Sequence, residues 1–393
     1  MKLFKRILGF ALLFGFMLEI SAVAQTNWTS IFSNSANAKP KVFPRRASII
    51  FIQVDGLGYG DLSCYGQTKY QTPNLDKLAA EGIRFTNYSV SAAASSSHAS
   101  LMTGKNPSHL RQRSDVEVPL AFDEITIAQI LKSTGYHTGL IGLWDLGAEN
   151  SSGVPWQKGF DEFAGYLDSA DAQNFYADYV DRYAPHAILN DTNKQMENFV
   201  GREMIYYNTG GKKGQYIPDV LAKAAANFVK NNQPDAFNHY KPFFLLLNFK
   251  IPDTNVMVPS DAPFSEEPWS QAEKNRAAFI ARLDNYVGQL RDQLNLLRMT
   301  NNVVIFFASA TTPKKSSDSD PKFFHSNISP NDLRAPLIAN WSGKISAGSA
   351  SGLNCSPQDF LPTATDIALF DMPTNIDGRS FLIELIGKKS PAP

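Results

Sequence analysis

The sequence predicts an α/β fold in which a mostly parallel sheet carries helices on both faces. Residues 47–54 form a nearly continuous apolar run, which is typical of a parallel strand buried on both faces. Further along the chain, short apolar runs alternate with longer amphipathic segments, as expected for a sheet covered on both sides. Because 43% of the 393 residues are hydrophobic, the chain can bury a large core.

The expected elements follow from apolar periodicity and from capping signals. Strands are predicted at residues 47–54, 138–141, 242–248, 303–307 and 336–340. Helices are predicted at residues 73–81, 95–103, 123–133, 218–231, 270–297 and 359–369. Thr72 is the expected cap of the first helix, with Pro73 at its first position. Residues 152–214 are aromatic and rich in glycine without a clear period, so we expect an irregular surface insertion there.

The amino-terminal region predicts an exported protein. Residues 1–24 read as a signal peptide with a basic start, an apolar centre and the small-residue cleavage site Ala22-Val23-Ala24. Residues 25–46 read as a flexible tether, and residues 47–393 as the folded domain. The apolar centre is too short for a membrane span, and no later segment reaches the required length. We therefore expect a periplasmic or secreted protein after cleavage near Ala24.

The balance of charges argues against nucleic acid as a partner, and the two cysteines leave open whether a disulfide forms. The chain carries 37 basic and 37 acidic residues, so binding of nucleic acid by bulk electrostatics is not expected. The two cysteines, Cys64 and Cys355, can form a disulfide in an exported protein or remain two separate buried thiols.

A carboxylate ends the first predicted strand. Asp55 follows the apolar run directly and is followed by Gly56, Gly58 and Gly60. The carboxyl ends of strands are where ligands bind in open α/β sheets.

Ordered motifs follow along the chain, beginning with Thr-Pro-Asn-Leu-Asp at 72–76 and Leu-Met-Thr-Gly-Lys at 101–105. Further ordered motifs cover residues 125–142, 157–167, 241–252, 281–290, 320–327, 334–345, 359–368 and 377–387.

Together these motifs resemble the sulfatases of the alkaline-phosphatase-like superfamily over nearly all of the mature chain. The resemblance implies an alkaline-phosphatase-like fold. Sulfatases usually continue into a smaller carboxy-terminal subdomain after the segment that resembles residues 377–387, so that subdomain is expected to be absent here.

The resemblance also implies a chemistry that this sequence does not keep. A sulfatase of this kind uses a formylglycine made from cysteine, a divalent cation that is usually calcium, and a cationic cluster around the sulfate. Of ten such positions, only Asp55 carries the family residue. The second metal-binding aspartate is replaced by Gly56, the modifiable cysteine by Ala94 and the arginine of its motif by His98.

The later site positions are replaced in the same way. The family lysine matches Leu143, and its two histidines match Asp145 and Asp253. The metal-binding Asp-Asn pair matches Ser309 and Ala310. The last lysine falls on His325, with Lys322 as a possible substitute.

These replacements predict a sulfatase fold without sulfatase activity. Ala94 offers no nucleophile, and Leu143 cannot bind an anion. Asp145 and Asp253 place negative charge where the family holds sulfate. Scaffold motifs persist while chemistry positions change, which favours a pseudo-enzyme that binds a glycan, a small molecule or a protein. Neither calcium nor formylglycine is expected.

A hydrolase with a changed mechanism remains the alternative. The run Ser95-Ser96-Ser97 can supply a relocated nucleophile or simply cap a helix. A new metal site of carboxylates and imidazoles can form from Asp55, His98, Asp145, Asp253 and His325. On either reading the sequence predicts one shared pocket, lined by Asp55, Ala94, His98, Asp145, Asp253 and Ser309.

Overall fold

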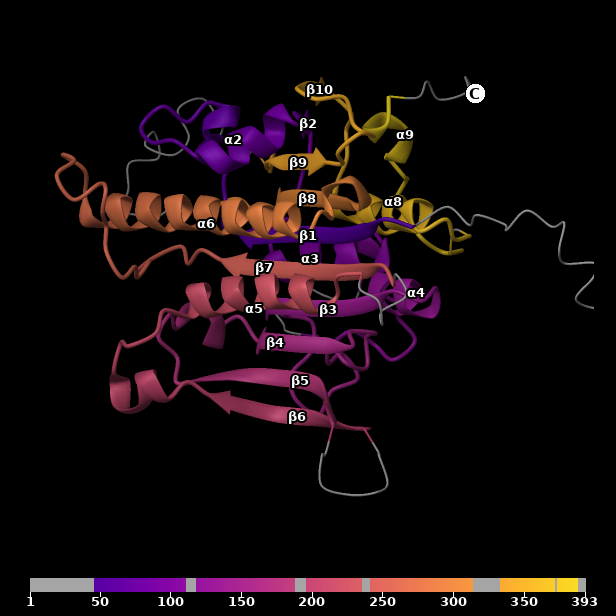
Figure 1. Cartoon of the computed structure of the whole chain (residues 1–393), viewed down its shortest axis with the longest axis horizontal. Coiled ribbons are helices and arrows are strands. Elements are labelled where there is room, and N and C mark those ends of the chain that lie inside the picture. Colours follow the sequence, from indigo (N-terminus) through magenta and orange to yellow (C-terminus); the bar gives the residue numbers. More distant parts are fainter. Residues whose placement is uncertain are drawn as a thin grey trace, which may run out of the picture. The chain divides into compact units, whose positions relative to one another are not determined.

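A single mixed sheet organises the protein, with the strand order β10-β2-β9-β8-β1-β7-β3-β4-β5-β6 (Figure 1). The computed structural model describes residues 46–110, 118–187, 196–234, 241–313, 333–371 and 373–387. The side chains of residues 185–187 and 196–198 are also left out of the description. The predicted signal peptide and nearly all of the predicted tether lie outside the described residues.

The central five strands are parallel. They are β8 (Val303–Ser309), β1 (Ser48–Asp55), β7 (Phe243–Lys250), β3 (His137–Leu143) and β4 (Glu162–Tyr166). Every residue of β1 is buried, because β1 lies between two parallel neighbours and under helices on both faces. The predicted mostly parallel α/β sheet is therefore confirmed.

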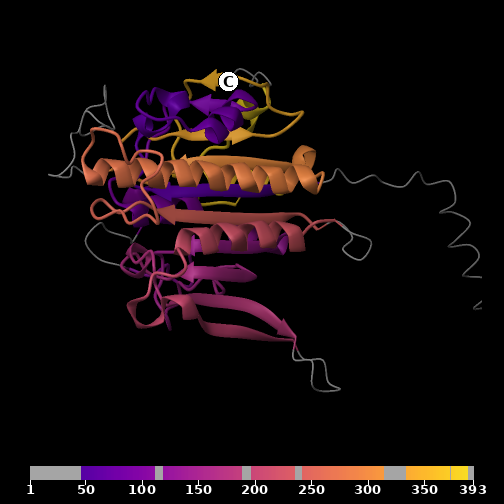
Figure 2. The same cartoon turned by 60° about the vertical axis from the view of Figure 1, so that its left-hand side comes forward.

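Helices cover both faces of this sheet (Figures 1 and 2). Helices α2 (Pro73–Ala80), α5 (Ile217–Asn231) and α6 (Gln271–Leu296) share one apolar core with Ile50, Ile52 and Val54 of β1. Helices α3 (Ala94–Thr103), α4 (Ile127–Ser133), α8 (Phe360–Ile367) and α9 (Leu382–Leu385) share the other with Ile49 and Phe51. The alternation along β1 is thus what separates the two cores.

Three strands of the sheet differ from the prediction or were not predicted. Strand β9 (Leu337–Asn340) pairs antiparallel with both of its neighbours, β2 (Ile83–Phe85) and β8. The three-residue strands β2 and β10 (Ser349–Ser351) were not predicted, since runs this short carry no readable period.

The prediction of an irregular insertion at residues 152–214 was wrong. This segment contains β4 and the long ribbon of β5 (Tyr179–Ala187) and β6 (Met196–Met204), which extends the sheet at one edge. Phe199, Val200 and Met204 of the edge strand are exposed. Because the ribbon buries little of its surface, its sequence lacks the hydrophobic alternation that identifies a half-buried strand.

Capping side chains explain where two helices begin. Helix α4 starts at Ile127 rather than near Asp123, because Thr126 and Gln129 form a reciprocal capping box. The same arrangement of Ser270 and Glu273 starts α6. Thr72 is the N-cap residue of α2 with Pro73 at the first position, as predicted, but its side chain makes no capping hydrogen bond. Its hydroxyl instead accepts from the Ser63 N–H at 3.0 Å.

Both cysteines are free thiols, Cys64 half-buried and Cys355 buried. Burial raises the pKa of each thiol to about 12, so both are protonated at neutral pH. Within the described ranges, no helix is long and apolar enough to cross a membrane.

Candidate functional site

The carboxyl ends of four neighbouring parallel strands bring the site positions together. In the register of the sheet, Asp55 of β1 pairs with Lys250 of β7, and Val54 pairs with Ser309 of β8. Gly142, next to Leu143 at the end of β3, pairs with Asn248 of β7. This is the edge at which ligands bind in sheets of this kind.

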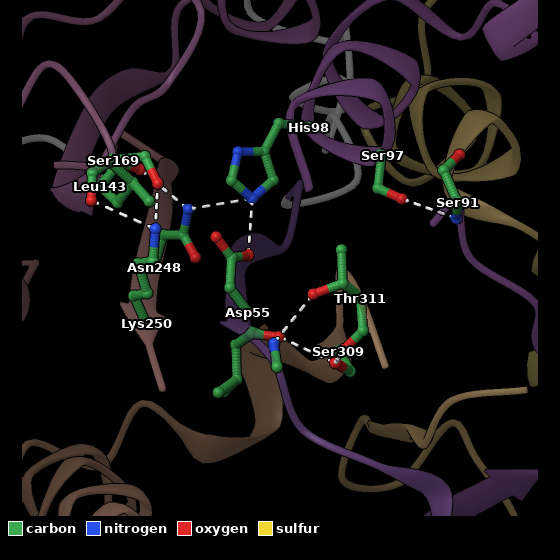
Figure 3. A network of polar contacts seen from close by, with 12 residues as sticks. Asp55, Ser91, Ser97, His98, Leu143, Ser169, Asn248, Lys250, Ser309 and Thr311 are labelled. Atoms are coloured by element: carbon green, nitrogen blue, oxygen red, sulfur yellow. Dashed lines mark hydrogen bonds and ion pairs between the residues drawn. The ribbon is translucent and has the colours of Figure 1, made fainter. Parts of the chain in front are cut away.

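A buried contact between Asp55 and His98 lies at the centre of this edge (Figure 3). The Nε2 atom of His98 is 2.8 Å from Oδ1 of Asp55, and both residues are 3% exposed. His98 comes from α3, and Ala94 lies one helical turn before it on the same face. Ala94, which the sequence resemblance matches to the nucleophile, thus shares a helix face with the imidazole that contacts Asp55.

The surroundings of His98 favour its charged form. Burial alone would lower the pKa of the imidazole, but the charge of Asp55 and its hydrogen bond act in the opposite direction. Asp145 adds to this effect and Lys250 opposes it, and the pKa of His98 is raised above its ordinary value. The Asp55 carboxylate therefore favours the charged form of the His98 imidazole.

Three polar atoms around this pair have no hydrogen-bond partner among the described residues: Oδ2 of Asp55, Nδ1 of His98 and Oδ1 of Asn248. The amide nitrogen of Asn248 is already used, since it donates to the Leu143 carbonyl at 2.8 Å. Buried polar groups of this kind are usually satisfied by ordered water or by a ligand. The site thus keeps polar binding capacity although its family residues are replaced.

Backbone contacts occupy the positions of the family's Asp-Asn pair. The hydroxyl of Ser309 lies 2.9 Å from the Val54 carbonyl and 2.7 Å from the Thr311 carbonyl (Figure 3). The Ala310 N–H donates to the Val54 carbonyl at 2.9 Å. These residues tie the end of β8 to the end of β1.

Gly56 is required by the turn that follows Asp55. Its φ is +77°, and a Cβ atom built there would lie 2.6 Å from the Ile251 carbonyl oxygen. Its N–H donates to the Thr311 hydroxyl at 2.9 Å. A side chain at this position would meet rigid backbone, so the second family aspartate does not fit the turn as it is built here.

A second buried ion pair, between Arg276 and Asp61, stabilises the same turn. Nη2 of Arg276 lies 2.7 Å from the Gly56 carbonyl and 2.7 Å from Oδ2 of Asp61. The same carboxylate oxygen accepts from the Gly58 N–H at 2.6 Å. Arg276 thereby fixes the backbone of the turn that follows Asp55.

The serine run lies in the first turn of α3, and its predicted capping role is wrong. The N-cap residue is Ala93, which has no capping side chain. Ser97 is fully buried, and its hydroxyl accepts from the Ser91 N–H at 2.9 Å, which anchors the segment before the helix (Figure 3).

The remaining predicted positions are placed differently. Leu143 is buried and takes part through its carbonyl. Asp145 adopts a left-handed conformation with φ +59° and acts on His98 through its charge. Asp253 is exposed in the loop after β7. His325 and Lys322 lie outside the described residues.

Sequence reasoning missed three residues that the structure brings to the site: Asn248, Lys250 and Thr311. Asn248 is a polar residue near the end of an otherwise apolar strand, and that pattern was the available signal. Lys250 donates to the Ser169 carbonyl at 3.1 Å, and Thr311 acts through its contact with Gly56.

The donor set is poor in metal ligands. Asp55 has one carboxylate oxygen on His98, Gly56 and Ala310 have no side-chain donor, and calcium takes six to eight oxygen ligands. In the part of the chain that the structure describes, no three histidine, cysteine or acidic side chains are grouped to hold a metal ion. His325 of the alternative Asp/His metal site lies outside the described residues, so that site stays a prediction.

Comparisons with known proteins agree with this fold. A family model described as Sulfatase matches residues 47–369. The N-acetylgalactosamine-6-sulfatase of Canis lupus familiaris is 28% identical over 369 residues, covering 88% of this chain and 67% of that protein. Human arylsulfatase A is 29% identical, covering 88% of this chain and 69% of its own length.

Solved structures show the same resemblance. The crystal structure of Ps i-CgsB has a TM-score of 0.68 at 26% identity, covering 87% of this chain and 76% of that one. A phosphonate monoester hydrolase from Silicibacter pomeroyi has a TM-score of 0.59 at 16% identity, which shows a shared fold alone. The chain spans about two thirds of the length of the curated relatives named above.

Proposed function

Because the chain belongs to the sulfatase family, we propose that it is an exported pseudo-sulfatase, which keeps the fold and acts as a binding or regulatory module. The observation that carries this proposal is the buried contact between Asp55 and His98. It joins the only retained metal-ligand position to a side chain from the helix that would present the nucleophile.

The contact opposes calcium binding in two ways. It occupies one oxygen of Asp55, and it places an imidazole with a raised pKa where the family places a divalent cation. A cation bound there would meet a positive charge in a buried, weakly screened environment. Within the described residues, Gly56, Ser309 and Ala310 provide no carboxylate to compensate.

The missing nucleophile supports the same proposal. Ala94 has only a methyl group, so no formylglycine can form at that position. Ser97 is fully buried and holds the Ser91 N–H. A relocated serine mechanism would have to rely on Ser95 or Ser96, earlier in the same helical turn.

A glycan is the ligand class that the relatives favour. The relatives include sulfatases named for N-acetylgalactosamine, and the structure of Ps i-CgsB is also known in complex with k-i-k-neocarrahexaose. The buried polar atoms without partners on Asp55, His98 and Asn248 can be satisfied by ligand hydroxyl groups or by water. Residues 1–24, read as a signal peptide, would deliver the protein to the periplasm or the medium.

Turnover assays test the proposal. Purified protein is assayed with a panel of aryl sulfates and aryl phosphates, beside a heat-denatured sample. The proposal predicts no turnover above that background. Reproducible turnover that is lost in Ser95→Ala, Ser96→Ala or Ser97→Ala, but kept in the exposed control Ser108→Ala, would overturn it in favour of a relocated nucleophile.

Binding assays test the module itself. Calorimetric titration with sulfated and unsulfated oligosaccharides of equal length measures whether the site retains a glycan. Substituting Asn248→Ala should weaken binding at the site, whereas Asn231→Ala, at the exposed end of α5, should not. Absence of any glycan binding would restrict the module to small-molecule or protein ligands.

A further inference from the structure

A cavity lies at the opposite end of the sheet from the candidate site. It has a volume of about 480 Å³ and opens between α2 and α6 over the start of β8. Its lining includes Val303, the first residue of β8, whereas Ser309 of the candidate site is the last. At the rise of a strand, these two ends are roughly 20 Å apart. Ligand binding at this cavity is therefore independent of the proposed function.

The floor of the cavity is apolar. It is formed by Leu294 of α6, Val303 and Ile305 of β8, and Ile345 in the segment after β9, all of them buried. A volume in this range is typical of pockets that hold small organic molecules.

The rim is polar and carries an excess of positive charge. Arg291 of α6 and Lys77 of α2 stand beside a single carboxylate, Glu81, among the lining residues. Nη2 of Arg291 pairs with Glu81, and Nζ of Lys77 lies 4.0 Å from the same carboxylate. The other polar lining residues are neutral: Asn295, Thr300, Asn340 and Ser342.

Glu81 marks the position that an anion would take. Its side chain is half exposed and can turn toward solvent, whereas the side chain of Arg291 is 12% exposed. The backbone under Glu81 is fixed, because its carbonyl accepts from Nδ2 of Asn340 at 2.9 Å. A ligand with one anionic group can thus replace the half-exposed carboxylate of Glu81 on the more buried guanidinium of Arg291.

We propose that this cavity binds a small amphiphilic monoanion, with its apolar body on the floor and its anionic group at Arg291 and Lys77. The apolar floor selects an aliphatic chain or a ring, and the rim selects negative over positive charge. The two carboxylates, that of the ligand and that of Glu81, compete for the same arginine.

If the ligand and Glu81 compete for Arg291, a substitution of Arg291 should weaken ligand binding and a substitution of Glu81 should strengthen it. Octanoate is titrated into purified protein by calorimetry, with octylamine as a probe of equal length and opposite charge. Octanoate should bind and octylamine should not. Arg291→Gln should weaken octanoate binding about tenfold or more, because a charge-assisted contact is lost. Glu81→Gln should strengthen it several-fold, because the competing carboxylate is gone.

Two further variants locate the site. Asn295→Trp places a large side chain at the exposed end of the cavity and should abolish octanoate binding. Lys230→Gln removes an exposed lysine of α5 away from the cavity and should leave binding unchanged within twofold. Thermal unfolding of each variant shows that it is folded. If Arg291→Gln fails to fold, Glu81→Gln and Asn295→Trp still decide the question.

Some results would overturn the proposal. These are equal binding of octanoate and octylamine, no octanoate binding at all, or octanoate binding that neither Glu81→Gln nor Asn295→Trp alters.

Discussion

Nε2 of His98 lies 2.8 Å from Oδ1 of Asp55, and the contact joins the end of the central strand to the helix that covers it. Both side chains are almost fully buried. A charge pair in such a place is costly to break, because the partner left behind keeps its desolvation penalty. The contact therefore makes His98 a structural residue of the site, and its loss has measurable consequences.

His98→Leu should lower the free energy of unfolding by about 3–5 kcal/mol, because Asp55 is then buried without its partner. Urea denaturation measures this loss. His109→Leu is a matched control, since His109 also lies 2.8 Å from an aspartate, Asp377, but at the surface. It should cost about 0–1 kcal/mol. Equal losses in the two variants would show that the buried pair has no special role.

The effect of His98 should depend on pH in a defined direction. The pKa of His98 is raised by Asp55, with Asp145 adding and burial and Lys250 opposing. A raised pKa in the folded state stabilises the protein fully below the unfolded value, about 6.5, and this stabilisation is lost as the pH rises through the folded value. The difference in unfolding free energy between wild type and His98→Leu should thus be largest below pH 6.5 and should shrink at higher pH. A difference that grows with pH would contradict this assignment.

Gly56→Ala should destabilise the protein by about 1–3 kcal/mol more than Gly66→Ala. Both glycines have positive φ, but only at Gly56 would a Cβ meet backbone, at 2.6 Å from the Ile251 carbonyl oxygen. At Gly66 nothing lies within 4 Å of that position. Thermal or urea unfolding of the two variants isolates the contact. Similar losses would mean that the turn relaxes freely and can accept a side chain.

Restoring the nucleophile alone should not restore activity. Ala94→Cys, even when converted to formylglycine, would lack a metal and a complete cationic cluster, and groups that act as a unit are strongly non-additive. The variant should show no aryl sulfate turnover above a denatured control. Only a combined repair has a chance of activity; it covers Gly56, Ala94, His98, Leu143, Asp145, Asp253, Ser309 and Ala310, together with a lysine at His325. Turnover by the single variant would show that the described residues already form a working site.

The sequence predicted the centre of the fold better than its edges. A nearly continuous apolar run identified β1 and its terminal Asp55, and the serine before residue 271 marked the start of α6. The ribbon of β5 and β6 was missed because an edge that buries little leaves no hydrophobic alternation to read.

The site was predictable as a set of positions but not as a set of contacts. The strand ends could be placed together because parallel strands share one carboxyl edge. The pairing of Asp55 with His98 depends on how α3 packs on the sheet, which no local pattern specifies. Asn248 and Thr311 were missed for the same reason, since their roles arise from neighbours distant in the chain.

Calorimetric titration of calcium into the purified protein tests the central claim most directly. The Asp55–His98 contact and the loss of carboxylates at Gly56, Ser309 and Ala310 predict no binding heat and no change in melting temperature when a chelator is added. Binding of one calcium ion per chain, with a melting temperature that falls on chelation and with Asp55→Asn abolishing both effects, would contradict the account.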